Sequence, residues 1–124
     1  DAADVPSWWQ GERYDAILLD APCSASGIVR RHPDVRWLRR ASDITALART
    51  QARLLDALWP TLVCGGRLLY CTCSVFKAEG QGQIDAFLQR HADAVPASEP
   101  PSPGHLLPLP DNGDGFFYSL LHKT

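Results

Sequence analysis

Two short apolar runs separated by a helical pattern are the feature that most constrains the fold of this chain. The first run covers residues 14–20 and the second covers residues 67–73. Between them, over residues 42–62, apolar side chains recur every three or four residues, which predicts an amphipathic helix that Gly65 and Gly66 end. A short continuous apolar run is typical of a strand buried on both faces. Strand, helix and strand predict a right-handed crossover between two parallel strands.

The remainder of the chain continues this α/β pattern. Residues 79–91 predict a second helix, residues 93–97 a short strand, and the aromatic-rich residues 116–122 a closing strand. Six of the ten prolines fall in residues 96–110, so we expect an extended loop with little regular structure there. The whole pattern indicates one half of an open α/β sheet.

Composition limits the class of protein. With 124 residues, 45% hydrophobic and 21% charged, the chain suits one domain with one core. We see neither an apolar run long enough for a membrane span nor an export signal. The net charge of −2 argues against a wholly basic nucleic-acid-coating protein but permits a local basic patch. Four cysteines without an export signal favour the cytoplasm, and the absence of Met suggests part of something longer.

Thiols and other polar groups gather where the two predicted strands end. Ligands of open parallel sheets bind beyond the carboxyl ends of the strands. Residues 20–27 leave the first strand and residues 71–74 leave the second. If the strands are neighbours, about 4.8 Å apart, Cys23 and either Cys71 or Cys73 face a common ligand. A carboxylate, two thiols and several hydroxyls would then share one crevice.

Each cysteine also has a purely structural interpretation, because a thiol in an apolar element commonly packs as a small hydrophobic group. Cys64, which precedes the two glycines, fits that role. Alternation along a strand puts Cys71 and Cys73 on one face, so spacing alone does not select a nucleophile. The Cys-x-Cys spacing and the distant histidines do not favour a metal site, and we expect no metal.

A basic run follows the first cysteine loop. Five of the twelve basic residues lie within residues 30–40, interleaved with Trp37. Arginines beside an aromatic ring suit phosphate contact and base stacking, although a charge run is commonly just a solvated face. We expect Arg30, Arg31 and Arg36 to contact nucleic acid.

These segments together resemble one enzyme family. The residues that carry the resemblance are Asp20-Ala21-Pro22-Cys23-Ser24-Ala25-Ser26-Gly27, Arg30-Arg31-His32-Pro33-Asp34, Gly65-Gly66-Arg67-Leu68-Leu69-Tyr70 and Thr72-Cys73-Ser74. They closely resemble the bacterial ribosomal RNA cytosine-C5 methyltransferases of the Sun/Fmu (RsmB) type, which belong to the NOL1/NOP2/Sun family. The likeness extends from Asp1 to the Gly113-Asp114-Gly115-Phe116-Phe117 ending and so covers essentially the whole chain.

The resemblance implies a role for individual residues. By it, Cys73 is the thiol that attacks the base and Cys23 assists release of the adduct. Asp20 and Asp1 match positions that help to hold S-adenosyl-L-methionine. Cys71 stands where family members tend to carry a small residue, and we assign it no role.

The resemblance also implies a fold and a domain boundary. We expect residues 1–124 to be the C-terminal half of a Rossmann-like, S-adenosylmethionine-dependent catalytic domain, with a mostly parallel sheet and an antiparallel last strand. The family's glycine-rich cofactor loop would lie upstream of Asp1. We therefore expect this part alone to be inactive and to bind the cofactor weakly or not at all.

The chemistry explains why two thiols are useful. Cytosine C5 is a poor nucleophile, so addition of a thiolate at C6 creates an enamine-like species that can take up a methyl group. A base must then remove the C5 proton so that the thiol can leave. The implied substrate is 16S ribosomal RNA. A transfer RNA cytosine-C5 methyltransferase and a non-catalytic RNA-binding domain remain alternatives, whereas a thiol redox protein lacks its Cys-x-x-Cys signature.

Overall fold

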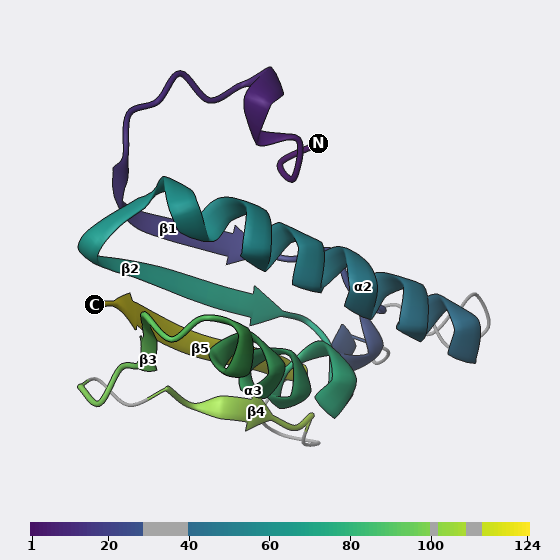
Figure 1. The fold of residues 1–124 in the computed structure, drawn as a ribbon. Coiled ribbons are helices and arrows are strands. Elements are labelled where there is room, and N and C mark those ends of the chain that lie inside the picture. Colours follow the sequence, from purple (N-terminus) through teal and green to yellow (C-terminus); the bar gives the residue numbers. More distant parts are fainter. Residues whose placement is uncertain (29–39, 100–101, 109–112) are drawn as a thin grey trace.

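The computed structural model describes residues 1–28, 40–99, 102–108 and 113–124 as one sheet with helices packed on it (Figure 1). The strand order is β1-β2-β5-β3, and β4 pairs with β5 beside β3. The strands are β1 (Tyr14–Asp20), β2 (Leu62–Thr72), β3 (Ala94–Pro96), β4 (Gly104–Leu106) and β5 (Phe116–Lys123).

The predicted parallel pair is present. Strand β1 runs parallel to β2, and the register places Asp20 opposite Cys71. Strand β5 lies antiparallel on the other side of β2, as expected for the last strand, and β3 and β4 are antiparallel to β5. Because β5 pairs with three strands, most pairings among the described residues are antiparallel, although the mixed α/β class is as expected.

The core lies between one face of the sheet and two helices, α2 (Ala41–Leu58) and α3 (Gln81–Arg90). Alternate residues of β2 and β5 point into this layer, as the period of a strand requires. Trp59 packs edge-on against Phe87 with ring centroids 5.1 Å apart. The side chains with no exposed surface include Leu55, Leu62, Leu68, Tyr70, Phe87, Phe117 and Leu121.

Strand β1 is not buried on both faces, contrary to the sequence expectation. Among the described residues it is an edge strand, and only Leu19 of its seven residues is buried. Leu18 points to the sheet face opposite α2 and α3 and is 69% exposed. The apolar run does predict the strand, but no described element covers its second face.

The two glycines do not end the first helix. Helix α2 ends at Leu58, and a 3-10 turn over Trp59–Thr61 follows because Pro60 cannot donate to the helical ladder. Strand β2 then begins at Leu62 and includes both glycines. Its register against β1 shifts between Tyr14 and Ala16, and Gly65 adopts a φ of +82°, so the glycines permit an irregular strand start.

Three further details differ from the sequence expectations. Cys64 lies in β2 and is exposed, so it is not a packing residue. The second helix begins at Gln81, after a 3-10 turn over Lys77–Glu79. Strand β4 lies inside the proline-rich segment, where we expected little regular structure. This short strand forms because its backbone pairs with β5.

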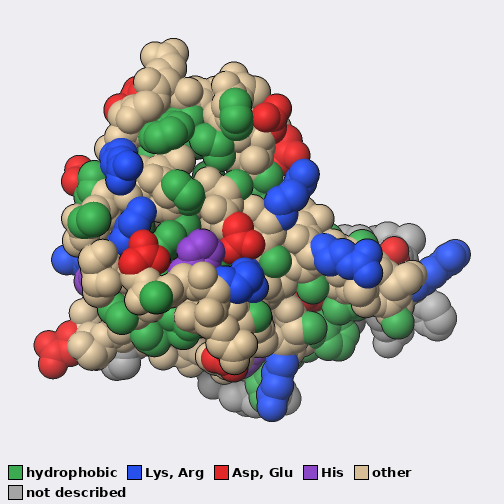
Figure 2. All heavy atoms as spheres, viewed as in Figure 1, with side chains coloured by type: hydrophobic (Ala, Val, Ile, Leu, Met, Phe, Trp, Pro, Cys, Tyr) green, Lys and Arg blue, Asp and Glu red, His purple; other side chains and the backbone are tan. Residues whose placement is uncertain are grey.

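Acidic and basic side chains are interspersed over the face that carries the helices (Figure 2). Between the two helices, Asp56 accepts bonds from Arg90 at 3.1 Å and lies 2.8 Å from the ring nitrogen Nε2 of His91. This mixed pattern agrees with the small net charge of −2.

Candidate active site

The two cysteine loops meet beyond the carboxyl ends of β1 and β2. The main-chain N–H of Ala21 continues the strand pairing by donating to the carbonyl of Cys71 at 3.0 Å. Farther along, the sulfur atoms of Cys23 and Cys73 lie 3.4 Å apart. The structure thus brings together two thiols that are fifty residues apart in the sequence, as the predicted sheet requires.

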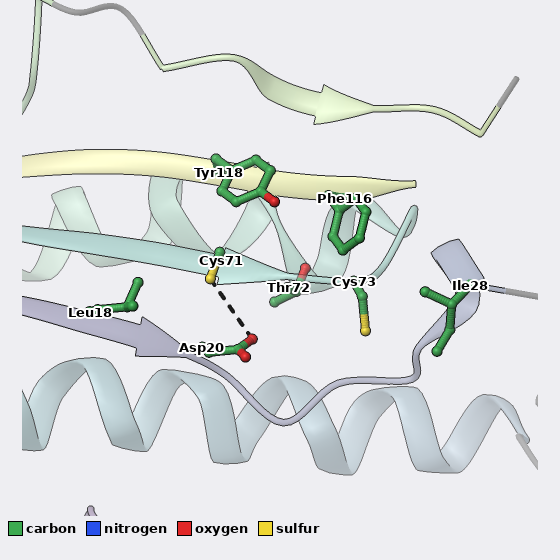
Figure 3. A pocket seen from close by; sticks show the side chains of 8 residues that line it. All are labelled: Leu18, Asp20, Ile28, Cys71, Thr72, Cys73, Phe116 and Tyr118. Atoms are coloured by element: carbon green, nitrogen blue, oxygen red, sulfur yellow. Dashed lines mark hydrogen bonds between the residues drawn. The ribbon is translucent and has the colours of Figure 1, made fainter. Parts of the chain in front are cut away.

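A pocket of about 320 Å³ opens beside these loops (Figure 3). Its volume is at the lower end of the range for ligand sites. Cys73 lines the pocket, whereas Cys23 is not among the lining residues. The lining residues are Leu18, Asp20, Ile28, Cys71, Thr72, Cys73, Phe116 and Tyr118.

Two aromatic residues of this pocket were not predicted as site residues. Phe116 and Tyr118 come from β5, which pairs antiparallel with β2 and places Tyr118 opposite Cys71. Alternation along β5 puts both rings on the same face as Cys71 and Cys73. The sequence shows that Phe116 and Tyr118 share a face of one strand. It does not show that this strand pairs with β2, which is what brings the two rings beside the cysteines.

The pocket contains a second thiol, that of Cys71, which forms a hydrogen bond to the Asp20 carboxylate. Cys71 Sγ donates to Asp20 Oδ1 at 3.8 Å (Figure 3). Burial and the adjacent negative charge of Asp20 raise the pKa of the Cys71 thiol to about 11. Cys71 is therefore protonated at neutral pH and acts as a hydrogen-bond donor.

Burial also acts on Cys23. It raises the pKa of the Cys23 thiol to about 12, and the side chain of the neighbouring Cys73 contributes in the same direction. A thiolate is the reactive form of cysteine, so Cys23 is poorly suited to a first attack at neutral pH. Because Cys73 lines the pocket and Cys23 does not, the geometry favours Cys73 as the thiol that meets a ligand.

The other predicted site residues lie in different places. Asp1 is not among the lining residues of this pocket; its carboxylate accepts a bond from Arg53 of α2 at 2.9 Å. Arg30, Arg31 and Arg36 lie outside the described residues. Arg40 is described, and its main-chain N–H donates to Asp43 Oδ2 at 2.9 Å at the start of α2.

A buried carboxylate behind the loops was missed by the sequence reasoning. Glu79 has no exposed surface, and its side chain accepts bonds from Ser24 and Ser74, the residues that follow the two loop cysteines. The sequence places Glu79 at the start of a predicted helix, where acidic residues are common for reasons of helix electrostatics. No local pattern distinguishes it from such a residue.

Within the described ranges, no three His, Cys, Asp or Glu side chains are grouped so that they could hold a metal ion. In those same ranges, no helix combines the length and the apolar character that crossing a membrane would require.

Comparison with solved structures defines the class of protein. NSun6 from Pyrococcus horikoshii, solved with SFG, superposes with a TM-score of 0.83 at 28% identity, over 99% of this chain and 33% of that one. A methyltransferase homolog protein from the same organism gives a TM-score of 0.81 at 26% identity, over 100% of this chain and 43% of that one. The fold is that of a Rossmann-like methyltransferase.

The family follows from the sequence comparisons. Residues 1–122 match the family model for the 16S rRNA methyltransferases RsmB/F, and the chain belongs to that family. It is 53% identical, over 99% of its length, to "Ribosomal RNA small subunit methyltransferase B" of Vibrio cholerae, and 55% identical, over 100%, to the protein of that name from Xanthomonas campestris. It spans 29% and 30%, respectively, of those two relatives.

Proposed function

We propose that this chain supplies the thiol chemistry of an enzyme that methylates C5 of cytosine in small-subunit ribosomal RNA. The observation that carries the proposal is the 3.4 Å approach of the Cys23 and Cys73 sulfurs at the edge of a pocket. Two adjacent thiols suit a reaction in which one forms a covalent bond to the base and the other assists its release. The names of the relatives support ribosomal RNA as the substrate.

Cys73 is the nucleophile in this proposal. Of the two thiols in the close pair, Cys73 is the one that lines the pocket. Its thiolate adds to C6 of the cytosine and so makes C5 electron-rich. The apolar and aromatic walls formed by Leu18, Phe116 and Tyr118 suit the flat face of a base.

Cys23 assists the release of the adduct. Before attack, the proximity of Cys73 is one of the causes that raise the pKa of Cys23. Once Cys73 is bonded to C6 it carries no charge, so its part of the opposition to ionisation of Cys23 ends, although burial still favours the protonated thiol. Cys23 must therefore lose its own proton to solvent first; its thiolate then accepts the C5 proton, and the bond between the Cys73 sulfur and C6 breaks.

S-adenosyl-L-methionine is the methyl donor of the proposal, and when bound it supplies an electrophilic methyl group. Asp20 lines the same pocket as Cys73, and its carboxylate can accept hydrogen bonds from a ligand that carries amino groups. SFG, an analogue of this donor, is present in the structure of the NSun6 neighbour. Asp20 and Asp1 are the proposed contacts of this chain.

The basic run is the proposed RNA contact. Arg30, Arg31 and Arg36 follow directly on the cysteine loop that ends at Gly27, so phosphate contacts there would hold the substrate beside the thiols.

The test uses a protein of the relatives' full length that carries this segment. It is incubated with unmodified 16S ribosomal RNA and isotopically labelled S-adenosylmethionine, and the nucleosides are then analysed by mass spectrometry. Labelled 5-methylcytidine is the expected product, and label in another nucleoside, or only in transfer RNA offered in parallel, contradicts the proposal.

A further inference from the structure

We propose that Glu79 is a positioning residue that sets the separation of the two thiols, because its carboxylate holds both cysteine loops at once. The role rests on the proposed function, since the separation of Cys23 and Cys73 matters only if both thiols act on one substrate. Its contacts, however, are independent of any ligand.

One carboxylate oxygen holds the first loop. Glu79 Oε2 accepts the main-chain N–H of Ser24 at 2.8 Å and the Nε2 amide of Gln51 at 3.0 Å. The same Gln51 amide donates to the carbonyl of Pro22 at 2.9 Å. The peptide units on both sides of Cys23 are therefore fixed, one directly and one through Gln51.

The other carboxylate oxygen holds the second loop. Glu79 Oε1 accepts the hydroxyl of Ser74 at 2.7 Å. Ser74 directly follows Cys73, and its Oγ also accepts the main-chain N–H of Phe76 at 3.1 Å. The Oγ atoms of Ser24 and Ser74 lie 3.4 Å apart, so the two loops also touch directly.

A carboxylate is suited to this task because it offers acceptor sites on two oxygens and needs no donor of its own. All three donors to Glu79 are neutral, and no ion pair among the described residues includes it. A fully buried carboxylate without a cation is unfavourable unless its bonds are well made. The loops are therefore held in a geometry that satisfies all three bonds.

Further hydrogen bonds fix the main chain of Glu79 and the side chain of its partner Gln51. The hydroxyl of Tyr70 donates to the main-chain carbonyl of Glu79 at 2.8 Å. The side-chain amide of Gln83 donates to Gln51 Oε1 at 3.3 Å and also to the carbonyl of Ala48. Because these supports come from β2, α2 and α3, regular elements hold both the main chain of Glu79 and its partner Gln51.

The hydrogen bonds of Glu79 matter for chemistry because they fix the separation of the Cys23 and Cys73 thiols. Reactive groups must be held to within a fraction of an ångström for efficient reaction, and the loops that carry Cys23 and Cys73 have little regular structure of their own. A carboxylate that served only to stabilise the core would leave the separation of the thiols unchanged when it is removed.

The separation of the thiols can be measured without any methylation. In a mixture of reduced and oxidised glutathione, a thiolate of the pair attacks glutathione disulfide and releases one glutathione. The second cysteine then displaces the other glutathione, so one disulfide is consumed and one is formed. The equilibrium constant for the bond between Cys23 and Cys73 reports how closely the protein holds them.

The experiment compares Glu79→Ala with the unchanged protein at the relatives' full length, and quantifies the linked Cys23 and Cys73 peptides by mass spectrometry. The equilibrium constant is expected to fall about tenfold or more in Glu79→Ala. The control is Ile84→Ala, a buried α3 residue in the same core, which should lose thermal stability but keep the constant.

An unchanged constant in a folded Glu79→Ala, or an equal fall in the Ile84→Ala control, overturns the proposal. If circular dichroism shows that Glu79→Ala does not fold, Ser74→Ala replaces it, because it removes the bond to Oε1 and should lower the constant in the same direction. An unchanged constant in Ser74→Ala also overturns the proposal. A protein that shows the tenfold effect but methylates no RNA separates this inference from the proposed function.

Discussion

The main-chain N–H of Gly27 donates to the carbonyl of Cys73 at 2.9 Å, which ties the end of the first cysteine loop to the second cysteine itself. The carbonyl of Gly27 in turn accepts the N–H of Gly115 at 2.7 Å. Three segments from different parts of the sequence thus meet at one glycine, and the backbone of Cys73 is held there.

Gly27→Ala should therefore destabilise the protein and disturb the site. An added Cβ would overlap the Gly115 carbonyl and lie 2.9 Å from the oxygen of Cys73. We expect a loss of about 1–3 kcal/mol in the free energy of unfolding, as for other overpacked sites. Denaturant unfolding measures it. Ala25→Gly is the control: Ala25 has a φ of +59°, so glycine relieves strain there and stability should not fall comparably.

The two loop cysteines should fail differently in a protein of the relatives' full length. Cys73→Ala removes the attacking thiolate, so neither a covalent RNA adduct nor methylated product should form. Cys23→Ala leaves attack intact but impairs release, so an adduct should accumulate as a slow band on a denaturing gel. An adduct in the Cys73 variant but not in the Cys23 variant would reverse the assigned roles.

Cys64→Ala supplies the matched control for these substitutions. Cys64 is an exposed thiol in β2 and is not among the residues that line the pocket. Methylation and adduct formation should match the unchanged protein, and a clear loss of either would point to a general sensitivity to cysteine replacement.

The shifted pKa of Cys23 predicts alkaline destabilisation. Burial raises this pKa from 9.0 to about 12, so the folded state favours the protonated thiol. The contribution to stability is complete below about pH 9 and is lost as the pH rises from 9 toward 12, because the unfolded chain releases the proton first. Cys71 and Tyr70, whose pKa values burial also raises, add in the same direction.

Thermal unfolding midpoints measured from about pH 8 to about pH 11 test this prediction. This range begins below the unshifted pKa of Cys23 and ends below its raised pKa. Cys23→Ser removes the thiol, so its midpoint should decline less steeply above about pH 9. Parallel curves for the two proteins would show that Cys23 does not carry the effect.

The basic run should contribute to RNA affinity in the full-length protein. Neutralising Arg30, Arg31 and Arg36 together should weaken RNA binding and reduce its dependence on salt by about one unit of slope per lost phosphate contact. Binding titrations at several salt concentrations measure both quantities. If neither changes, the run is only a solvated surface.

The sequence alone was enough to predict most of the elements, β4 excepted, and the meeting of the loops. The apolar run of β1, the periodicity of α2 and the run of β2 imply a parallel pair, and the carboxyl ends of parallel strands lie at one edge of a sheet. Cys23 and either Cys71 or Cys73 could therefore be expected to approach each other, and only the family resemblance selected Cys73. The element ends were less accurate, because Pro60 and the register shift beside Gly65 act through hydrogen bonding and not through apolar periodicity.

Only the tertiary structure decided which groups surround the thiols. Apolar periodicity reports how one element alternates along its own length, whereas strand pairing and burial depend on partners far away in the sequence. The pairing of β5 with β2 brings Phe116 and Tyr118 to the pocket, and the packing of α2 and α3 buries Glu79 between the loops. A local pattern cannot specify such contacts because they exist only once the separate elements have packed together.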